Sequence, residues 1–353
     1  MPDNIERILI VRTDRIGDVI LTLPMAAVLK RHYPQAGISM LIRRYTSELV
    51  KNSPHVEDIL YVDDEKGPVP MLRLVEVVKR GNFDVVFHTH PRFRIALLTF
   101  LAGIPLRVGT GYRWYSFLFN RKVYEHRKDA KFHELEYNLH LIRALGIDDD
   151  PGNVNPTIDV SAGMSARVEA HLRELGVKAG EPLIILHPGS HGSARNWSPE
   201  KFAELARLLA ANKDVRIVVT GGSGEEEIAQ EVYSNAGPNA LKIVDAFSLL
   251  EYAAFVKRAS LFVANSTGTL HIAAAVGTPV IGFFPQQASL SAKRWGPYAA
   301  KRTLFTPRDQ RADCMKCAGG SAERCECMDT INPEEVYRAA VALLPLSFAG
   351  GHP

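Results

Sequence analysis

Apolar runs and amphipathic stretches alternate along the first part of this chain of 353 residues. Continuous apolar runs are typical of strands buried on both faces, and four of them are predicted as strands at residues 6–12, 37–43, 57–63 and 83–89. Apolar residues at helical spacing predict helices between them, at residues 17–34, 47–54 and 70–82. This alternation predicts βαβ units and a parallel sheet covered by helices on both faces.

A second alternation of the same kind begins near residue 182. The segment from Pro91 to Leu145 is predicted to be mostly helical, with an aromatic and basic loop at 111–124. Residues 147–161 are rich in Asp, Asn and Pro, which is typical of a linker. The later strands are predicted at 182–190, 215–222, 241–246, 261–266 and 279–284, and helices at 199–212, 225–237, 250–259, 271–277 and 333–344. We therefore expect two similar α/β domains, residues 1–155 and 156–353, whose meeting line is a natural ligand cleft.

Composition and charge narrow the class of protein. Hydrophobic residues make up 46% and charged residues 23%, and the formal net charge is only +3, which argues against a nucleic-acid partner. The N-terminus enters a strand pattern at once, without the pattern of a signal peptide. The most apolar internal stretch, Ile95 to Pro105, is too short to span a bilayer as a helix. We expect a cytoplasmic protein.

The first chemically suggestive motif is RTDRIGDVILTLP, residues 12–24, between the first strand and the first helix. Gly17 permits a tight turn and a close approach of ligand to backbone. Asp18 lies at the carboxyl end of a parallel strand, where open α/β sheets bind their ligands. Two roles are open for Asp18: a cap of the helix, or a general base that takes a proton from a sugar hydroxyl.

Two further motifs follow strands of the second half. In ILHPGSHGSARNW, residues 185–197, glycines and serines offer hydrogen-bond donors and Arg195 adds a fixed positive charge, which suits a diphosphate. In residues 263–284, Ser266, Thr267 and Gly268 lead into a helix of small residues whose N-terminus favours phosphate, and His271 lies in its first turns. Each motif also fits an ordinary polar loop or a packed histidine. None contains GxGxxG, which argues against a nicotinamide or flavin enzyme.

All four cysteines lie close together, in CMKCAGGSAERCEC. Cys314, Cys317, Cys325 and Cys327 form two close pairs, which can make a tetrahedral thiolate site for a structural zinc or iron ion. Free thiols and a local disulfide are the alternatives. Four thiolates would leave no open coordination position, so a catalytic metal is not expected there.

Taken together, the three motifs resemble glycosyltransferase family 9, the lipopolysaccharide heptosyltransferases. The similarity is carried by residues 12–34, by HPGSHGSARNWSPEKFAELA and by ANSTGTLHIAAAVGTPVIGFF, and in order and spacing it covers nearly the whole chain. The resemblance implies a GT-B architecture, in which two Rossmann-like domains with parallel sheets face each other across a cleft. It also implies an inverting reaction that requires no metal cofactor.

The resemblance assigns roles to individual residues. The general base falls on Asp18. The donor-binding positions fall near Ser190 and Arg195, on Thr267, Gly268 and His271, on Glu225 or Glu226 for the ribose, and on the backbone near Phe247 for the adenine. The sequence departs from the family at two places: Ser266 stands where several relatives carry Asp, and Arg195 and Asn196 stand where one branch has Lys before the Trp.

An anionic acceptor would suit the basic residues of the first half, although some of these belong simply to a solvated surface. Arg15 and Arg92 are the preferred candidates because both follow predicted strands, and Gly17 lies beside them. The resulting hypothesis is heptose transfer from ADP-heptose to a lipopolysaccharide core acceptor at the inner membrane surface, with peripheral membrane attachment as a further option. The alternatives are another nucleotide sugar, a protein acceptor, a non-catalytic nucleotide-sugar-binding protein, or an epimerase on the same fold.

Overall fold

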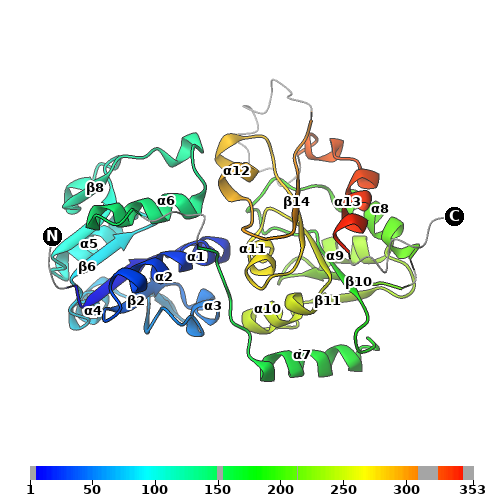
Figure 1. The fold of residues 1–353 in the computed structure, drawn as a ribbon, viewed down its shortest axis with the longest axis horizontal. Coiled ribbons are helices and arrows are strands. Elements are labelled where there is room, and N and C mark those ends of the chain that lie inside the picture. The colour runs from blue at the N-terminus through cyan, green and yellow to red at the C-terminus, as the bar shows by residue number, and fades with distance from the viewer. Residues whose placement is uncertain (1–4, 149–153, 213, 309–324, 345–353) are drawn as a thin grey trace. The chain divides into compact units, whose positions relative to one another are not determined.

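A six-stranded parallel sheet forms the centre of each of the two units into which the chain divides, residues 1–159 and 160–353. The structure is a computed structural model and describes residues 5–148, 154–212, 214–308 and 325–344 (Figure 1). The predicted boundary, after residue 155, lies in the same Asp- and Pro-rich segment.

The first unit has the strand order β3-β2-β1-β6-β7-β8. Its strands are β1 (Arg7–Val11), β2 (Gly37–Ile42), β3 (Asp58–Tyr61), β6 (Val85–His88), β7 (Leu106–Thr110) and β8 (Arg121–Val123), and a small hairpin joins β4 (Asp63–Asp64) to β5 (Gly67–Pro68). Its helices are α1 (Ile16–Ile20), α2 (Leu23–His32), α3 (Glu48–Lys51), α4 (Met71–Arg80), α5 (Phe93–Leu101) and α6 (Glu134–His140).

The second unit repeats this arrangement in the order β11-β10-β9-β12-β13-β14. Its strands are β9 (Leu183–His187), β10 (Arg216–Gly221), β11 (Leu241–Val244), β12 (Leu261–Asn265), β13 (Val280–Phe283) and β14 (Arg302–Phe305). Its helices are α7 (Ala162–Glu174), α8 (Pro199–Ala210), α9 (Glu226–Tyr233), α10 (Leu249–Arg258), α11 (Gly268–Ala275), α12 (Ala292–Trp295) and α13 (Pro333–Leu343).

Both sheets therefore have the Rossmann order, in which the chain starts at the centre, moves to one edge and returns to build the other half. The direction reverses between β1 and β6 in the first unit, and between β9 and β12 in the second. Ligands of open α/β sheets bind at such reversal points, beyond the carboxyl ends of the strands. The prediction of two Rossmann-like α/β units with parallel sheets is confirmed.

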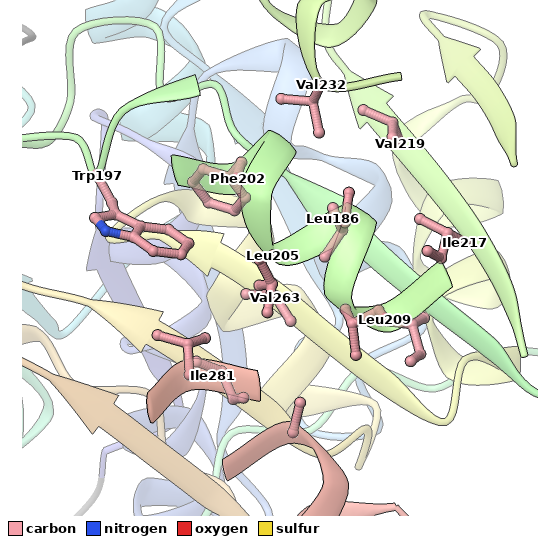
Figure 2. Close-up of a cluster of buried hydrophobic side chains, with 14 of the residues drawn as sticks. Leu186, Trp197, Phe202, Leu205, Leu209, Ile217, Val219, Val232, Val263 and Ile281 are labelled. Atoms are coloured by element: carbon pink, nitrogen blue, oxygen red, sulfur yellow. The ribbon is translucent and has the colours of Figure 1, made fainter. Parts of the chain in front are cut away.

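The central strands β9, β12 and β13 of the second unit are largely apolar because helices cover both faces of the sheet. On one face, Trp197 and the apolar side of α8 pack over Leu186 of β9 and Val263 of β12 (Figure 2). Val336 and Ala340 of α13 join the same core. On the other face, α7, α10 and α11 cover residues such as Ile185 and Phe262, whose side chains are fully buried. Burial on both faces explains the continuous hydrophobic runs.

Two predictions about the first unit are wrong. The single helix expected at 17–34 is two helices, because Pro24 lacks the amide that a continuous helix would need and can stand only in the first turn of α2. The segment from Pro91 to Leu145 is not mostly helical, since it contains β7 and β8. β7 contains Arg107 and Gly109 among its five residues and β8 has only three residues, so neither forms a continuous apolar run, and neighbouring strands of the sheet hold them in place.

Candidate functional site

A buried arginine organises the carboxyl end of β1. Arg12 is 2% exposed, and its guanidinium spans three carboxylates. Its Nε lies 2.7 Å from Asp14 Oδ1, its Nη1 lies 3.1 Å from Glu134 Oε1, and its Nη2 donates to Asp18. Asn138 Oδ1 accepts a further bond of 3.3 Å from Nη1. A buried guanidinium with this many partners is a rigid centre, because its planar fork fixes the direction of each bond.

The same network holds the break between α1 and α2. Asn138 donates from Nδ2 to the carbonyl oxygen of Leu21 at 3.1 Å and to Thr22 Oγ1 at 3.2 Å. The Thr22 hydroxyl in turn donates to the carbonyl oxygen of Asp18 at 2.8 Å. The helix that carries Asp18 is thus attached to α6, which lies more than a hundred residues later in the chain.

The environment of Asp18 gives its carboxyl group a pKa suited to proton transfer near neutrality. Burial raises the pKa of Asp18 from 3.8 to about 6, while Arg12 lowers it and the like charges of Asp14 and Glu134 raise it. Its side chain is still 13% exposed. A carboxylate with a pKa near the working pH can both accept and release a proton efficiently.

A neutral histidine lies beside this network. His90 follows β6, and its Nδ1 is 3.1 Å from Asp14 Oδ2. Burial lowers the pKa of His90 to about 4, and the nearby charges of Arg12 and Arg92 lower it further. The imidazole is therefore uncharged at neutral pH, and it adds a polar group without adding positive charge.

The predicted residues of the first motif lie at this same end of the sheet. Arg15 is exposed and is the N-cap residue of α1, Gly17 is buried in α1, and Asp18 lies in the first turn. The alternative that Asp18 caps the helix is therefore wrong. Arg92 is exposed and is the N-cap residue of α5. Because β1 and β6 are neighbours, the loops that carry Arg15 and Arg92 meet at the strand reversal.

At the corresponding end of the second sheet, the carboxylate of Glu225 stabilises two loops. This residue is 4% exposed, and its carboxylate accepts the backbone N–H of His191 at 3.0 Å and that of Gly222 at 2.9 Å. A Cβ on Gly189 would lie 2.2 Å from the Glu225 Cδ atom, so only glycine leaves room for this carboxyl group. Glu226 instead points to the surface and pairs with Lys242 at 2.9 Å.

Three polar residues of the loop after β9 are buried: Ser190 is 5% exposed, Arg195 is 7% exposed and Asn196 is 9% exposed. Ser190 Oγ and Asn196 Oδ1 have no hydrogen-bond partner among the residues that the structure describes. A buried polar atom without a partner costs free energy, and a ligand with complementary groups removes this cost. The loop is therefore preorganised for a polar ligand.

Asn265, at the end of β12, connects this loop to the next one. It is fully buried, accepts the backbone N–H of Trp197 at 2.8 Å and donates to the carbonyl oxygen of Pro188 at 2.7 Å. Asn265 lies within the strand predicted at 261–266, and no functional role was predicted for it. An amide side chain at the end of an otherwise apolar strand is the signal that could have identified it.

The third motif forms the N-terminus of α11 as predicted. Thr267 is the N-cap residue, Gly268 begins the helix, and the two hydroxyl groups of Thr267 and Thr269 lie 2.6 Å apart. Ser266 precedes the cap, and His271 is buried in the helix at 6% exposure. The first turn of α11 follows β12 directly and so lies beside the strand reversal between β9 and β12, and the free backbone amides of a first helical turn favour an anion.

Phe247 lies in the loop after β11. Its ring stacks on Phe255 with a centroid distance of 5.2 Å and meets the edge of His171 at 5.3 Å. These contacts fix the course of the backbone at Phe247, the feature expected to face the adenine.

Two of the four cysteines can be described. Cys325 and Cys327 are 7% and 9% exposed and belong to the hydrophobic core of the second unit. Cys314 and Cys317 lie outside the described residues. Across the described ranges, no group of three or more His, Cys, Asp or Glu side chains could hold a metal ion. The zinc or iron site stays a prediction.

None of the helices within the described ranges is long and apolar enough to cross a membrane.

Comparisons with known proteins agree with this fold. The model of glycosyltransferase family 9 (heptosyltransferase) matches residues 71–320. A putative glycosyltransferase of Haemophilus influenzae is 31% identical over 311 residues, which cover 86% of this chain and 89% of that protein. Lipopolysaccharide heptosyltransferase 3 of Escherichia coli is 23% identical over 95% of this chain and 98% of its own length.

Among solved structures, the ADP-heptose lipopolysaccharide heptosyltransferase II of E. coli superposes with a TM-score of 0.77 at 21% identity, over 96% of this chain and 98% of that one. This likeness concerns the fold, and it confirms the predicted GT-B class of two Rossmann-like units.

Proposed function

This chain belongs to glycosyltransferase family 9 and is a glycosyltransferase, and from that premise we propose that it transfers heptose from ADP-heptose to a lipopolysaccharide core acceptor. The relatives named lipopolysaccharide heptosyltransferases support the acceptor class, and the E. coli structure named for ADP-heptose supports the donor. One observation carries the chemistry: the carboxyl group of Asp18, with a pKa of about 6, lies at the strand reversal of the first unit.

In the proposed reaction, Asp18 is the general base. It takes the proton of an acceptor hydroxyl while the hydroxyl oxygen forms a bond to the anomeric carbon of the donor sugar. The bond from that carbon to the diphosphate oxygen breaks, and ADP leaves with the electron pair. Attack on the face opposite the leaving group inverts the configuration at the anomeric carbon.

We propose that the second unit, residues 156–353 in the predicted division, binds the donor. Its diphosphate would accept hydrogen bonds from the Ser190 hydroxyl and the first amides of α11, and Arg195 would compensate its charge. The unpartnered hydroxyl of Ser190 supports this assignment, whereas the unpartnered Asn196 Oδ1 is an acceptor and would suit a hydroxyl group of the donor. Preorganised donors of this kind stabilise the charge that develops on the leaving group, so the proposed reaction needs no metal cofactor.

The remaining donor contacts are proposed from the family resemblance. Glu225 would bind the ribose, since each of its oxygens accepts one backbone N–H and retains a further lone pair. The backbone at Phe247 would bind the adenine. Ser266, Thr267, Gly268 and His271 would surround the second phosphate and the sugar.

We propose that the first unit, residues 1–155, binds the acceptor. Arg15 and Arg92 are exposed N-cap residues on neighbouring loops beside Asp18, and Gly17 lets the acceptor approach the backbone. Phosphates and carboxylates are the groups that two such arginines would bind.

Substitution of Asp18 tests the proposal. Asp18→Ala is expected to lower the rate of heptose transfer by a factor of about 10²–10⁴, the usual contribution of a general base, while ADP affinity changes within a few-fold. The matched control is Asp58→Ala, which removes an exposed carboxylate of the same unit. Loss of ADP binding in Asp18→Ala would show a structural role, and full activity would favour a non-catalytic or unrelated role for the carboxylate.

Calorimetry with ADP, UDP and GDP separates the alternative donors. Preference for ADP supports heptose, whereas preference for UDP would redirect the proposal to a hexose or aminosugar. Donor consumption without any acceptor would indicate an epimerase. Transfer to a peptide rather than to lipopolysaccharide would indicate a protein acceptor.

A further inference from the structure

Exposed aromatic side chains gather in one segment of the first unit. Of the eleven large hydrophobic side chains that are exposed in the described part of the chain, eight lie between residues 93 and 132. Residues 91–132 also contain nine Lys or Arg and only two Asp or Glu, a formal charge of +7, whereas the whole chain carries +3. Some of these charges serve the fold, since Arg107 donates to the carbonyl oxygen of Leu118 and Arg127 pairs with Glu134. Exposed aromatic side chains gathered beside exposed cations are nevertheless typical of an interaction surface.

The topology brings part of this segment to one edge of the sheet. Arg92 and Phe93 follow β6, residues 112–114 follow β7, and Tyr124 follows β8. These strands are parallel neighbours, so their carboxyl ends meet at the edge that also carries Asp18. We call this set the aromatic–basic rim: Arg92, Phe93, Tyr112, Arg113, Trp114 and Tyr124.

Contacts among the rings hold the rim together. The rings of Phe93 and Trp114 lie 4.8 Å apart, and those of Tyr112 and Tyr124 lie 5.6 Å apart in an edge-on arrangement. His126 stacks on Tyr112 at 3.7 Å. Despite these contacts Trp114 is 73% exposed and Tyr124 is 63% exposed. The aromatic side chains of the rim thus contact one another and form one exposed surface.

A basic hollow adjoins the rim at β8. Arg121, Lys122 and Arg143 line a cavity of about 290 Å³, together with the close pair of Glu125 and His140. Arg143 also contacts Asp148 at 2.8 Å, while Arg121 and Lys122 are exposed on the edge strand. A phosphate is the group that such a hollow suits.

We propose that the aromatic–basic rim binds the headgroup region of a lipid bilayer that contains anionic lipid. Trp and Tyr combine an apolar ring with a polar group and concentrate at membrane–water interfaces, and clustered cations bind anionic lipid surfaces. A single-stranded nucleic acid is less well matched, because nucleic-acid binders usually carry a strong basic excess and the formal net charge of the whole chain is only +3.

This inference rests on the proposed function in one respect. A lipid-linked acceptor explains why the rim and Asp18 both lie at the carboxyl ends of the strands of the first sheet. An enzyme held at the bilayer by this edge would meet the saccharide headgroup of such an acceptor without extracting the lipid.

The intrinsic fluorescence of Trp114 provides the test. The chain has three tryptophans, of which Trp197 is fully buried and the Trp295 indole donates to the carbonyl oxygen of Ser289. Vesicles of phosphatidylglycerol and phosphatidylethanolamine are expected to shift the emission to shorter wavelength, and Trp114→Phe is expected to remove the shift while the protein still sediments with the vesicles. Pure phosphatidylcholine vesicles are expected to bind weakly, and added salt is expected to weaken binding to the anionic vesicles.

A paired substitution has a matched control in the same unit. Arg113→Gln with Trp114→Ser is expected to weaken vesicle binding at least about tenfold, since each cation near an anionic surface accounts for about fivefold. Leu72→Ser with Arg73→Gln changes an adjacent exposed pair on α4, outside the rim, and is expected to leave binding unchanged. ADP affinity, measured in solution by calorimetry, is expected to stay unchanged in both variants and shows that they are folded.

Several outcomes would overturn the inference. These are equal binding to phosphatidylcholine, equal losses in the two paired variants, binding to single-stranded nucleic acid but not to vesicles, or a dimer in lipid-free solution that Trp114→Ser dissociates. Binding to lipopolysaccharide but not to phosphatidylglycerol would make the rim a saccharide site instead. Vesicle binding without heptose transfer would contradict only the proposed function, and transfer without vesicle binding would contradict only this inference.

Discussion

Arg12 is expected to control the proton affinity of Asp18. In Arg12→Met the guanidinium is replaced by an apolar side chain, and the carboxylates of Asp14, Asp18 and Glu134 lose their shared cation. An opposite charge at contact distance lowers a carboxyl pKa by about one to three units. Its loss should therefore move the pKa of Asp18 from about 6 to about 7–9.

Two measurements report this change. The acid limb of the pH profile of kcat/KM should move upward by about one to three pH units, because the general base must be ionised to act. The ¹³C resonance of the Asp18 carboxyl carbon, assigned with Asp18→Asn, should titrate at the same higher pH, and this second measurement needs no substrate. Arg12→Lys keeps a single positive charge without the planar guanidinium. The acid limb of its kcat/KM profile should therefore lie between those of the wild type and Arg12→Met.

Folding must be checked in parallel, since removal of one member of a buried ion pair costs about 3–5 kcal/mol of unfolding free energy. Glu134→Gln should change the pKa of Asp18 in the opposite direction. It removes a negative charge close to Asp18, so the pKa of Asp18 should fall. An acid limb that stays near pH 6 in Arg12→Met, or that moves in the same direction in Glu134→Gln, would refute the electrostatic coupling.

Four further outcomes are expected. The contribution of Asp18 to the unfolding free energy should fall by about 2 kcal/mol as pH rises from 4 to 7, because its folded-state pKa of about 6 lies above its ordinary value of 3.8, and Asp18→Asn should remove this loss in denaturant titrations. Gly189→Ala should cost about 1–3 kcal/mol by displacing the Glu225 carboxylate from its two backbone donors, with a smaller cost in a Glu225→Ala background. Arg195→Ala should weaken ADP binding by about 1.5–3 kcal/mol in calorimetry. Trp197→Ala should lower the unfolding free energy by about 3–5 kcal/mol, because its fully buried ring stacks on Phe283 at 4.3 Å.

The last three of these outcomes each have a matched control. Gly163→Ala adds a methyl group where nothing lies within 4 Å, so it should not destabilise the protein. Arg207→Ala removes an exposed arginine of α8 and should leave ADP affinity unchanged. Trp114→Ala removes a ring that is 73% exposed and should cost far less unfolding free energy than Trp197→Ala. Equal effects in a variant and its control would contradict the corresponding structural explanation.

Much of the fold could be predicted from local patterns. The buried strands of both sheets are continuous apolar runs, and their loops carry Gly, Ser and Asp at the positions where parallel sheets bind ligands. Asp18 was correctly placed at such a position, and Ser190 and Thr267 follow the ends of β9 and β12 as expected. The strands β7 and β8 were missed because Arg107 and Gly109 interrupt the apolar run of β7 and because β8 has only three residues.

The environment of the candidate base required the tertiary structure. Arg12 meets Glu134 and Asn138 across 122 and 126 residues of chain, and Asn265 meets Trp197 across 68. No local pattern reports such pairs, because they exist only once the sheet has brought distant loops to one edge. Local sequence therefore determined which segments become strands and helices and which loops carry polar chemistry. Long-range packing alone decided which charges share a buried space, and with it the pKa of Asp18.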